Sequence, residues 1–138
     1  MALMFEAVNP LRIAGAVAVL AAGIALGGCT TLSAGESTTL AAPLQNGVLA
    51  SEFASLTGPA RVMAANAEYK ALESGQTGAP VRWKQSDAVF GSVVPQQPYS
   101  VGSTNCRRYV HSVTVDGDSR AASGTACRSA DGVWEPLT

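Results

Sequence analysis

The dipeptide Asp116-Gly117 separates two runs of strand-forming residues and is a strong signal for a tight β-hairpin. A two-residue type I′ turn at this dipeptide pairs Val115 with Asp118 and fixes every further pair along the two strands. In that register Cys106 lies directly opposite Cys127, at a non-hydrogen-bonded position where Cα atoms are about 4.5 Å apart. A disulfide can span that distance. The sequence therefore predicts a hairpin closed by a disulfide between these two cysteines.

The same register places Tyr109 opposite Gly124, where an aromatic ring can cover a strand glycine. A disulfide-closed loop of about 20 residues stabilises a fold by roughly 3 kcal/mol in the chain-entropy treatment. This matters because the part of the chain that can form a core is small.

Residues 1–28 are typical of a lipoprotein signal peptide. The uncharged run 13–26 is shorter than the roughly 20 residues that a membrane-spanning helix needs, and it ends in Leu26-Gly27-Gly28-Cys29. This is a lipobox: an apolar residue, two small residues and a cysteine. We expect the Cys29 thiol to receive a diacylglyceryl group, signal peptidase II to cleave between Gly28 and Cys29, and the freed amine to take a further acyl chain such as palmitate. More than one acyl chain gives stable membrane anchoring.

Two alternatives to this leader remain open: an ordinary secretory signal with a coincidental cysteine, and a short anchor helix that is not cleaved. The odd number of cysteines favours lipidation, because a lipid on Cys29 leaves Cys106 and Cys127 as a pair in an oxidising compartment. Thr30 takes the place of the aspartate that retains many lipoproteins in the inner membrane. We therefore expect sorting to the outer membrane.

Three parts of the chain are predicted. The signal peptide spans 1–28, and the lipidated cysteine with a flexible tether rich in Thr, Ser and Ala spans 29–57. A folded domain spans 58–138. Its helix is expected over 60–73, with Val62, Tyr69 and Leu72 on the buried face and Glu68 and Glu73 in surface ion pairs with Arg61 and Lys70.

The rest of the domain reads as short strands, with a proline-containing loop over 95–104. We predict an α+β fold in which one N-terminal helix packs on an antiparallel β-meander of four to five strands closed by the disulfide. The expected strands are 81–85, 88–94, 105–115, 118–128 and 133–137.

Composition and motifs argue against several functions. The formal net charge is −1 and charged residues make up 14% of the chain, so nothing favours nucleic-acid binding. The single histidine, His111, is expected to be a half-exposed packing residue. We find no catalytic constellation, no cofactor motif, no metal-ligand cluster and no sign of a small-molecule substrate. These absences predict a protein that is not an enzyme.

A series of short motifs follows the helix and resembles one known family. The chain is similar over about 58–135 to the C-terminal domain of the rickettsial 17 kDa surface antigen family of outer-membrane lipoproteins. Many family members carry a glycine zipper between lipid and domain, which 30–57 lacks. The motifs are Ala71-Leu72-Glu73, Gly75-Gln76, Pro80-Val81, Trp83, Gly91, Val93, Pro95, Cys106-Arg107, Tyr109, Gly124-Thr125-Ala126-Cys127-Arg128, Asp131-Gly132 and Trp134.

The resemblance implies a lipid-anchored outer-membrane surface antigen with a structural or envelope-interaction role. Its expected partners are the membrane, through the lipid on Cys29, and other envelope proteins. The face of the outer membrane, periplasmic or external, stays open. Two alternatives are a periplasmic inhibitor of proteases or lysozyme, for which 95–104 is the candidate inserting loop, and an accessory lipoprotein in outer-membrane assembly.

Overall fold

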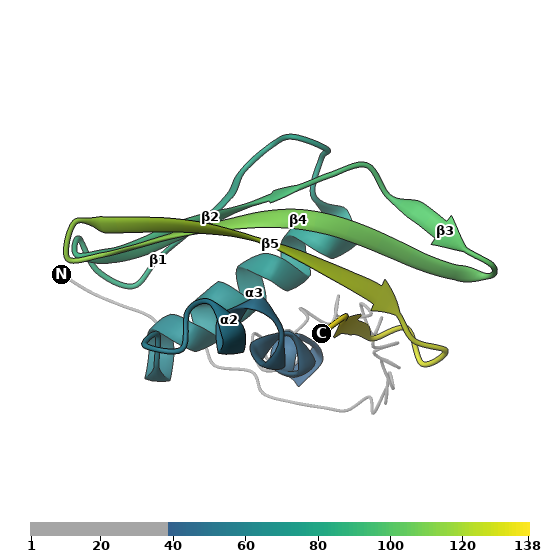
Figure 1. Cartoon of the computed structure of the whole chain (residues 1–138), viewed down its shortest axis with the longest axis horizontal. Helices are drawn as coiled ribbons and strands as arrows, with labels where there is room; N and C mark the ends of the chain where they lie inside the picture. Colours follow the sequence, from purple (N-terminus) through teal and green to yellow (C-terminus); the bar gives the residue numbers. More distant parts are fainter. Residues whose placement is uncertain (1–38) are drawn as a thin grey trace, which may run out of the picture. The chain divides into compact units, whose positions relative to one another are not determined.

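A computed structural model describes residues 39–138 of the protein. The predicted signal peptide and the predicted sites at Gly28 and Cys29 lie outside the described residues. Within the described part, a long helix, α3 (Gly58–Ser74), crosses one face of an antiparallel sheet. The helix is the predicted one, extended by two residues at its start and by one at its end. The α+β prediction is therefore confirmed in outline (Figure 1).

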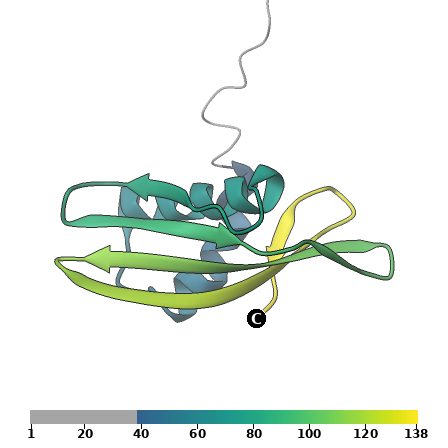
Figure 2. The ribbon, with the colours of Figure 1, turned by 90° about the horizontal axis from the view of Figure 1, so that it is seen from above.

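The sheet has six strands, one or two more than predicted. The strands are paired in the order β1-β2-β4-β5-β6, and β3 pairs separately with β4. Figure 2 shows β5 along one margin of the sheet. Their bounds are β1 Val81–Lys84, β2 Val89–Pro95, β3 Tyr99–Val101, β4 Thr104–Val115, β5 Asp118–Arg128 and β6 Trp134–Pro136.

The predicted hairpin register is confirmed. Val115 pairs with Asp118, Tyr109 with Gly124 and Cys106 with Cys127. Asp116 and Gly117 have φ of 51° and 90°, the two positive values that a type I′ turn requires. The predicted disulfide joins Cys106 to Cys127, whose Cα atoms lie 4.0 Å apart.

The predicted loop over 95–104 contains a strand, which is the main error in the expected sheet. β2 ends where Pro95 pairs with Tyr109, and β3 begins where Tyr99 pairs with Cys106. One more residue lies between these pairs on the proline-containing chain than on β4, so β2 and β3 form a single strand interrupted by a bulge. The two prolines hid this continuity. β3 then turns into β4 through Gly102, which has a φ of 60°.

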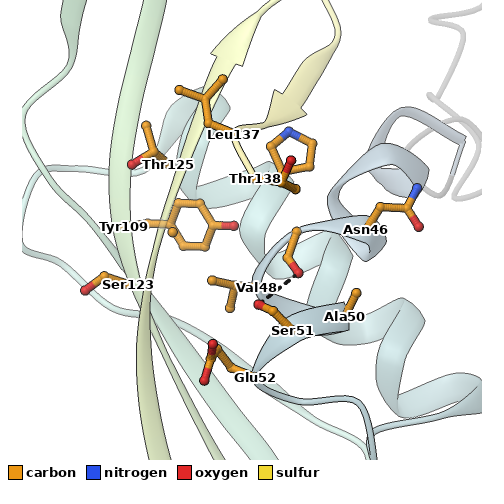
Figure 3. A pocket seen from close by; sticks show the side chains of 13 residues that line it. Asn46, Val48, Ala50, Ser51, Glu52, Tyr109, Ser123, Thr125, Leu137 and Thr138 are labelled. Carbon is orange, nitrogen blue, oxygen red and sulfur yellow. Dashed lines mark hydrogen bonds between the residues drawn. The ribbon is translucent and has the colours of Figure 1, made fainter.

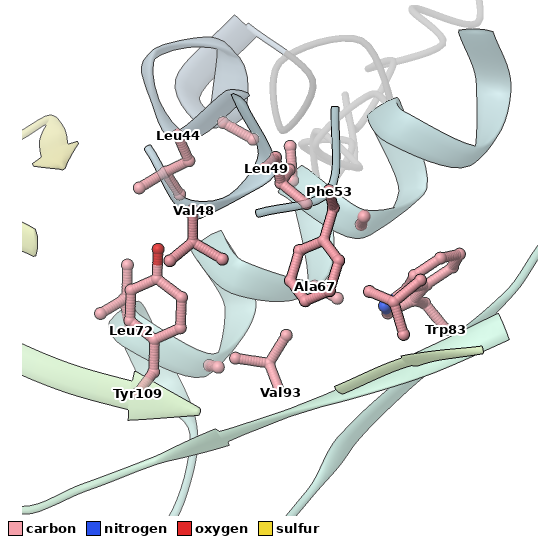
Figure 4. Packing of buried hydrophobic residues seen from close by; sticks show 14 of the residues in the cluster. Leu44, Val48, Leu49, Phe53, Ala67, Leu72, Trp83, Val93 and Tyr109 are labelled. Carbon is pink, nitrogen blue, oxygen red and sulfur yellow. The ribbon is translucent and has the colours of Figure 1, made fainter. Parts of the chain in front are cut away.

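The predicted tether was wrong over its described part. Residues 42–46 form a 3-10 helix, η1 (Ala42–Asn46), and residues 48–51 form a single helical turn, α2 (Val48–Ser51). Leu44, Leu49 and Phe53 are buried in the core, and Figure 4 shows them facing the sheet residues Tyr109 and Val93. The folded domain therefore begins before residue 58.

Arg61 fixes this N-terminal segment to α3. Its guanidinium donates to the carbonyls of Gln45 (2.6 Å), Leu49 (3.0 Å) and Leu56 (3.2 Å). Segments this short have too little hydrophobic repetition to be predicted as helices.

The buried face of α3 is only partly the predicted one: Leu72 is buried as expected, and Tyr69 packs against the edge of the core. Val62 and Tyr69 are only half-buried, and Met63 is exposed. Small side chains let the helix lie close to the sheet, so alanines rather than larger residues dominate its buried face. The buried residues are Ala60, Ala64, Ala65, Ala67, Glu68, Ala71 and Leu72.

Candidate functional site

Four buried polar side chains link α3 to the sheet. Glu68 lies on α3, Trp83 on β1, and Tyr109 and His111 on β4. His111 Nδ1 is 2.6 Å from Glu68 Oε1, and the Tyr109 hydroxyl donates to Glu68 Oε2 at 3.0 Å. Trp83 Nε1 donates to His111 Nε2 at 2.9 Å. We call these four residues the buried network.

The indole determines which nitrogen of His111 carries a proton. Because Trp83 Nε1–H can only donate, His111 Nε2 must be the unprotonated nitrogen that accepts. The proton of the neutral imidazole is then on Nδ1, where it is donated to Glu68. His111, Glu68 and Tyr109 have no solvent exposure, so these hydrogen bonds replace all contact with water.

Burial dominates the electrostatics of the network. Desolvation raises the pKa of Glu68 above its ordinary value of 4.5, and the hydrogen bond and electrostatic attraction of His111, the hydrogen bond from Tyr109 and the charge of Arg61 oppose that rise. Desolvation, followed by the neighbouring Glu68 carboxyl, also raises the pKa of Tyr109. Burial therefore favours the neutral form of each group, whereas the hydrogen bonds from His111 and Tyr109 favour the charged carboxylate of Glu68.

The geometry resembles the carboxylate-histidine pair of a hydrolase, but the second imidazole nitrogen is not free to contact a nucleophile or substrate. In such a pair the second imidazole nitrogen faces a nucleophile or substrate. Here that nitrogen accepts the indole proton, and the imidazole is fully buried. The network therefore joins helix to sheet. The predictions that His111 is half-exposed and that Glu68 forms a surface pair with Arg61 were wrong, because Glu68 and His111 bury each other.

Arg107 is a second buried link; it belongs to a family motif, but the sequence did not indicate this role. From β4 it donates to the carbonyls of Ala71 (2.9 Å), Leu72 (3.1 Å) and Gly75 (2.7 Å) at the end of α3. A cation at a helix C-terminus satisfies the last free carbonyls and the negative end of the helix dipole. Burial lowers the pKa of Arg107 from its ordinary value.

A third link, more exposed than the other two, joins the end of α3 to the last strands. Glu73 accepts from Arg128 Nη2 and from Trp134 Nε1, each at 2.8 Å. The Arg128 guanidinium also lies over the Trp134 ring, 5.6 Å from its centroid. Glu73 was predicted to pair with Lys70, but its partners come from β5 and β6.

Two aromatic rings lie on strand glycines on the helix-facing side of the sheet. The Trp83 ring covers Gly91, where an added Cβ would come 2.8 Å from the indole. Tyr109 covers Gly124 in the same way, as the hairpin register predicts. Only glycine permits either close approach, so these pairs fix the two rings that take part in the buried network.

A groove of about 530 Å³ opens above Tyr109, between the N-terminal segment, the β5 margin and the end of the chain. Figure 3 shows the Tyr109 ring at its floor, with Ser51 and Glu52 on one side and Ser123 and Thr125 on the other. Its lining holds a single charged side chain, Glu52. The groove offers backbone groups and small side chains more than a chemically distinctive pocket.

The described residues contain no group of three or more His, Cys, Asp or Glu side chains arranged to hold a metal ion. No helix within 39–138 is both long and apolar enough to cross a membrane. Of the predicted sites, Cys106 and Cys127 form the expected disulfide. Glu68 and Arg107 were missed because their partners are distant in sequence.

The fold and these contacts define a small, disulfide-closed α+β domain whose polar side chains mainly hold its helix on its sheet. Residues 70–135 match the sequence model of a family described as 17 kDa outer membrane surface antigen. This match over the C-terminal region confirms the family resemblance that the motifs predict.

Several curated relatives carry the name 17 kDa surface antigen. The protein of Rickettsia bellii is 36% identical over 77 residues, covering 54% of this chain and 48% of the relative. The protein of Rickettsia conorii is 36% identical over 78 residues with the same shares, and that of Rickettsia prowazekii is 34% identical over 68 residues, with shares of 48% and 43%. The chain thus spans about half the length of the curated relatives it matches. No solved structure matches the chain.

The family motifs lie on the three links and the ring-glycine pairs. Arg107 caps α3, Trp83 and Tyr109 belong to the buried network, and Arg128 and Trp134 hold Glu73. The residues that carry the resemblance are therefore residues that build the domain.

Proposed function

We propose that the protein is a lipid-anchored surface antigen of the outer membrane with a structural or envelope-interaction role. The observation that carries the proposal is the combination of the lipobox at Leu26-Gly27-Gly28-Cys29 with the family match over 70–135. The family description names the outer membrane, and the relatives are named as surface antigens.

The domain's chemistry supports a binding role over catalysis. Glu68 and His111 are hydrogen-bonded to other side chains of the domain and have no exposed surface, so neither can meet a substrate. The antigen role would then rest on the domain's outer surface. The lipid on Cys29 would keep that surface at the membrane, where envelope proteins are its partners.

Metabolic labelling with a clickable fatty acid tests the anchor. Expressed as the full chain in a Gram-negative host, the protein should take up label and fractionate with the outer membrane. Cys29→Ala should abolish the label. The matched control is the double variant Cys106→Ala/Cys127→Ala, which removes the other cysteines and should keep the label. Persistent labelling of Cys29→Ala would refute lipidation at this residue.

A second candidate, inhibition of an extracytoplasmic protease or lysozyme, is supported by the β3–β4 hairpin. This hairpin extends past the end of the sheet and exposes Tyr99 and Val101, the latter by 61% (Figure 2). An inhibitor needs such a projecting element to enter an active site. The purified chain should then block a serine protease or lysozyme, and Tyr99→Ala/Val101→Ser should relieve the block. Absence of inhibition at micromolar protein would eliminate this role.

A further inference from the structure

The margin of the sheet formed by β5 is an open edge. Within 39–138, β5 pairs along its length with β4 on one side, whereas on its other side β6 pairs only with Ala126–Arg128. The stretch Asp118–Gly124 therefore has no strand beside it among the described residues. It contains no proline, no lysine and no bulge, which natural sheets use to protect an edge, and its charged side chains are Asp118 and Arg120.

The hydrogen-bond alternation shows which residues face outward. The Thr125 carbonyl, on the open side, accepts from the Leu137 N–H at 2.9 Å. In an antiparallel strand every second residue directs its N–H and C=O the same way. Ser119, Ala121 and Ser123 consequently present their backbone donors and acceptors to the open side. Their side chains are small and exposed, so nothing of their own covers these groups.

Charges of both signs lie along this edge on the helix-facing side: Arg120 and Asp118 on β5, and Glu52 beside it. Glu52 and Arg120 line one shallow cavity at the margin, and Glu52 also lines the groove beside Ser123 and Thr125. Within the part of the chain that the structure describes, neither side chain forms an ion pair. Glu52 therefore stands beside the stretch between Arg120 and Gly124.

We propose that this edge pairs with the same edge of a second copy of the chain, forming a two-fold symmetric dimer with one continuous sheet. The open stretch Asp118–Gly124 has Ala121 at its middle, so an axis through Ala121 pairs the whole stretch with itself. Ala121 then faces Ala121 of the second copy, and Ser119 faces its Ser123. All three positions are outward-facing, so their backbone groups bond across the axis.

Charge complementarity points to a second copy as the occupant and favours this register over the neighbouring one centred on Arg120. With the axis at Ala121, Arg120 lies opposite Ala122 of the second copy. Glu52 of the second copy stands beside this part of its own edge, so it comes near Arg120. Arg120 forms no ion pair with the acidic residues that line the same cavity in its own chain, and it thus gains a carboxylate of the second copy as a partner. Shifting the axis by one residue to Arg120 would instead place the two guanidinium groups directly opposite each other, which is unfavourable. The partner's turn would lie over the groove, opposite Gly124 and beside Thr125.

Cysteine cross-linking in intact cells tests the register. Paired residues across the axis have Cα atoms about 5.5 Å apart, within disulfide range. Mild oxidation of Ala121→Cys in the full chain should therefore give a disulfide-linked dimer on a non-reducing gel. Ser119→Cys is the matched control, because it lies on the same exposed face but about 14 Å from its own copy at 3.4 Å per residue. The parent chain controls for the natural cysteines.

A dimer several-fold more abundant for Ala121→Cys than for Ser119→Cys would support the proposal. Equal cross-linking would indicate random collision and overturn it, as would a cross-link to a protein of different mass or no cross-link at all. Circular dichroism and the intact Cys106–Cys127 disulfide should show that each variant folds.

Charge reversal tests the occupant. In the Ala121→Cys background, Arg120→Glu should reduce the cross-linked dimer several-fold, and adding Glu52→Arg should restore it. Cross-linking that is unchanged by Arg120→Glu would overturn the charge-paired dimer, and so would failure of the double reversal to restore it.

Discussion

Two glutamates of one helix, Glu68 and Glu73, perform the same task in different surroundings. Each accepts hydrogen bonds from two side chains of the sheet and so fastens α3 to it: Glu68 from His111 and Tyr109, and Glu73 from Arg128 and Trp134. Glu68 is completely buried, whereas the Glu73 side chain is 33% exposed and its partner Arg128 is 38% exposed. Water can replace the partners of Glu73 but not those of Glu68.

The comparison shows that two glutamates only five positions apart on one helix can contribute very differently to the free energy of unfolding. A lost partner in the interior leaves a polar group without any hydrogen bond, and that penalty exceeds the net worth of the bond itself. A lost partner at the margin is screened and rehydrated. The following substitutions test that difference.

Glu68→Ala should have the largest effect. It leaves the Tyr109 hydroxyl and His111 Nδ1–H buried without an acceptor and opens a cavity, so the free energy of unfolding should fall by roughly 3–5 kcal/mol. Urea unfolding followed by tryptophan fluorescence measures this loss. A loss below 1 kcal/mol would mean that removing the buried Glu68 costs no more stability than removing the partly exposed Glu73.

Tyr109→Phe removes one of the two donors to Glu68 and keeps the ring over Gly124. We expect a loss of about 1–3 kcal/mol, because one carboxyl oxygen stays buried without a donor. The same denaturation measurement applies, with Tyr69→Phe, a half-buried tyrosine of α3, as the control that should change little. Equal losses in the two variants would contradict the role of the network.

Glu73→Ala should cost only about 0.5–1 kcal/mol, because its ion pair with Arg128 is solvent-exposed. Raising the salt concentration should shrink this loss further. A loss comparable to that of Glu68→Ala would abolish the distinction between the two glutamates.

Glu68→Gln sharpens the comparison through pH. Burial raises the pKa of Glu68 in the folded state above 4.5, so the folded protein retains a proton that the unfolded chain releases. Stability carried by this group is present below about pH 4.5 and is lost as pH rises through the folded-state pKa. Relative to Glu68→Gln, the natural protein should therefore lose stability as pH rises from about 4.5 through the folded-state pKa of Glu68. Parallel pH profiles of the two unfolding free energies would disprove a raised pKa.

The hairpin could be predicted to the residue because its determinants are local. Asp116-Gly117 dictates the turn, the turn dictates the pairing, and the pairing places Cys106 against Cys127. The other strands next to recognisable turns were also predicted. β3 was missed because Pro95 and Pro98 look like breakers when the bulge between them cannot be anticipated.

The buried network could not be predicted because its members become neighbours only in the fold. Glu68 and His111 are 43 positions apart, and a glutamate between helix-favouring residues normally faces water. One signal was available: Glu68 lies four residues from both Ala64 and Leu72, and therefore on the same helix face as the alanines that pack closely against the sheet. The N-terminal segment failed for a related reason, since its helical turns are defined by Arg61 and the core rather than by their own sequence.

The Arg61 contacts have a mechanical consequence. Tension applied to the chain from its N-terminal side enters the described domain at η1, ahead of any strand. The Gln45 and Leu49 carbonyls transmit it through Arg61 into α3, and the close approach of Gly47 to Pro136 transmits it to the last strand. A pull from that side is therefore divided between α3 and the C-terminal end of the sheet, and each of these is bonded directly to the disulfide-closed hairpin.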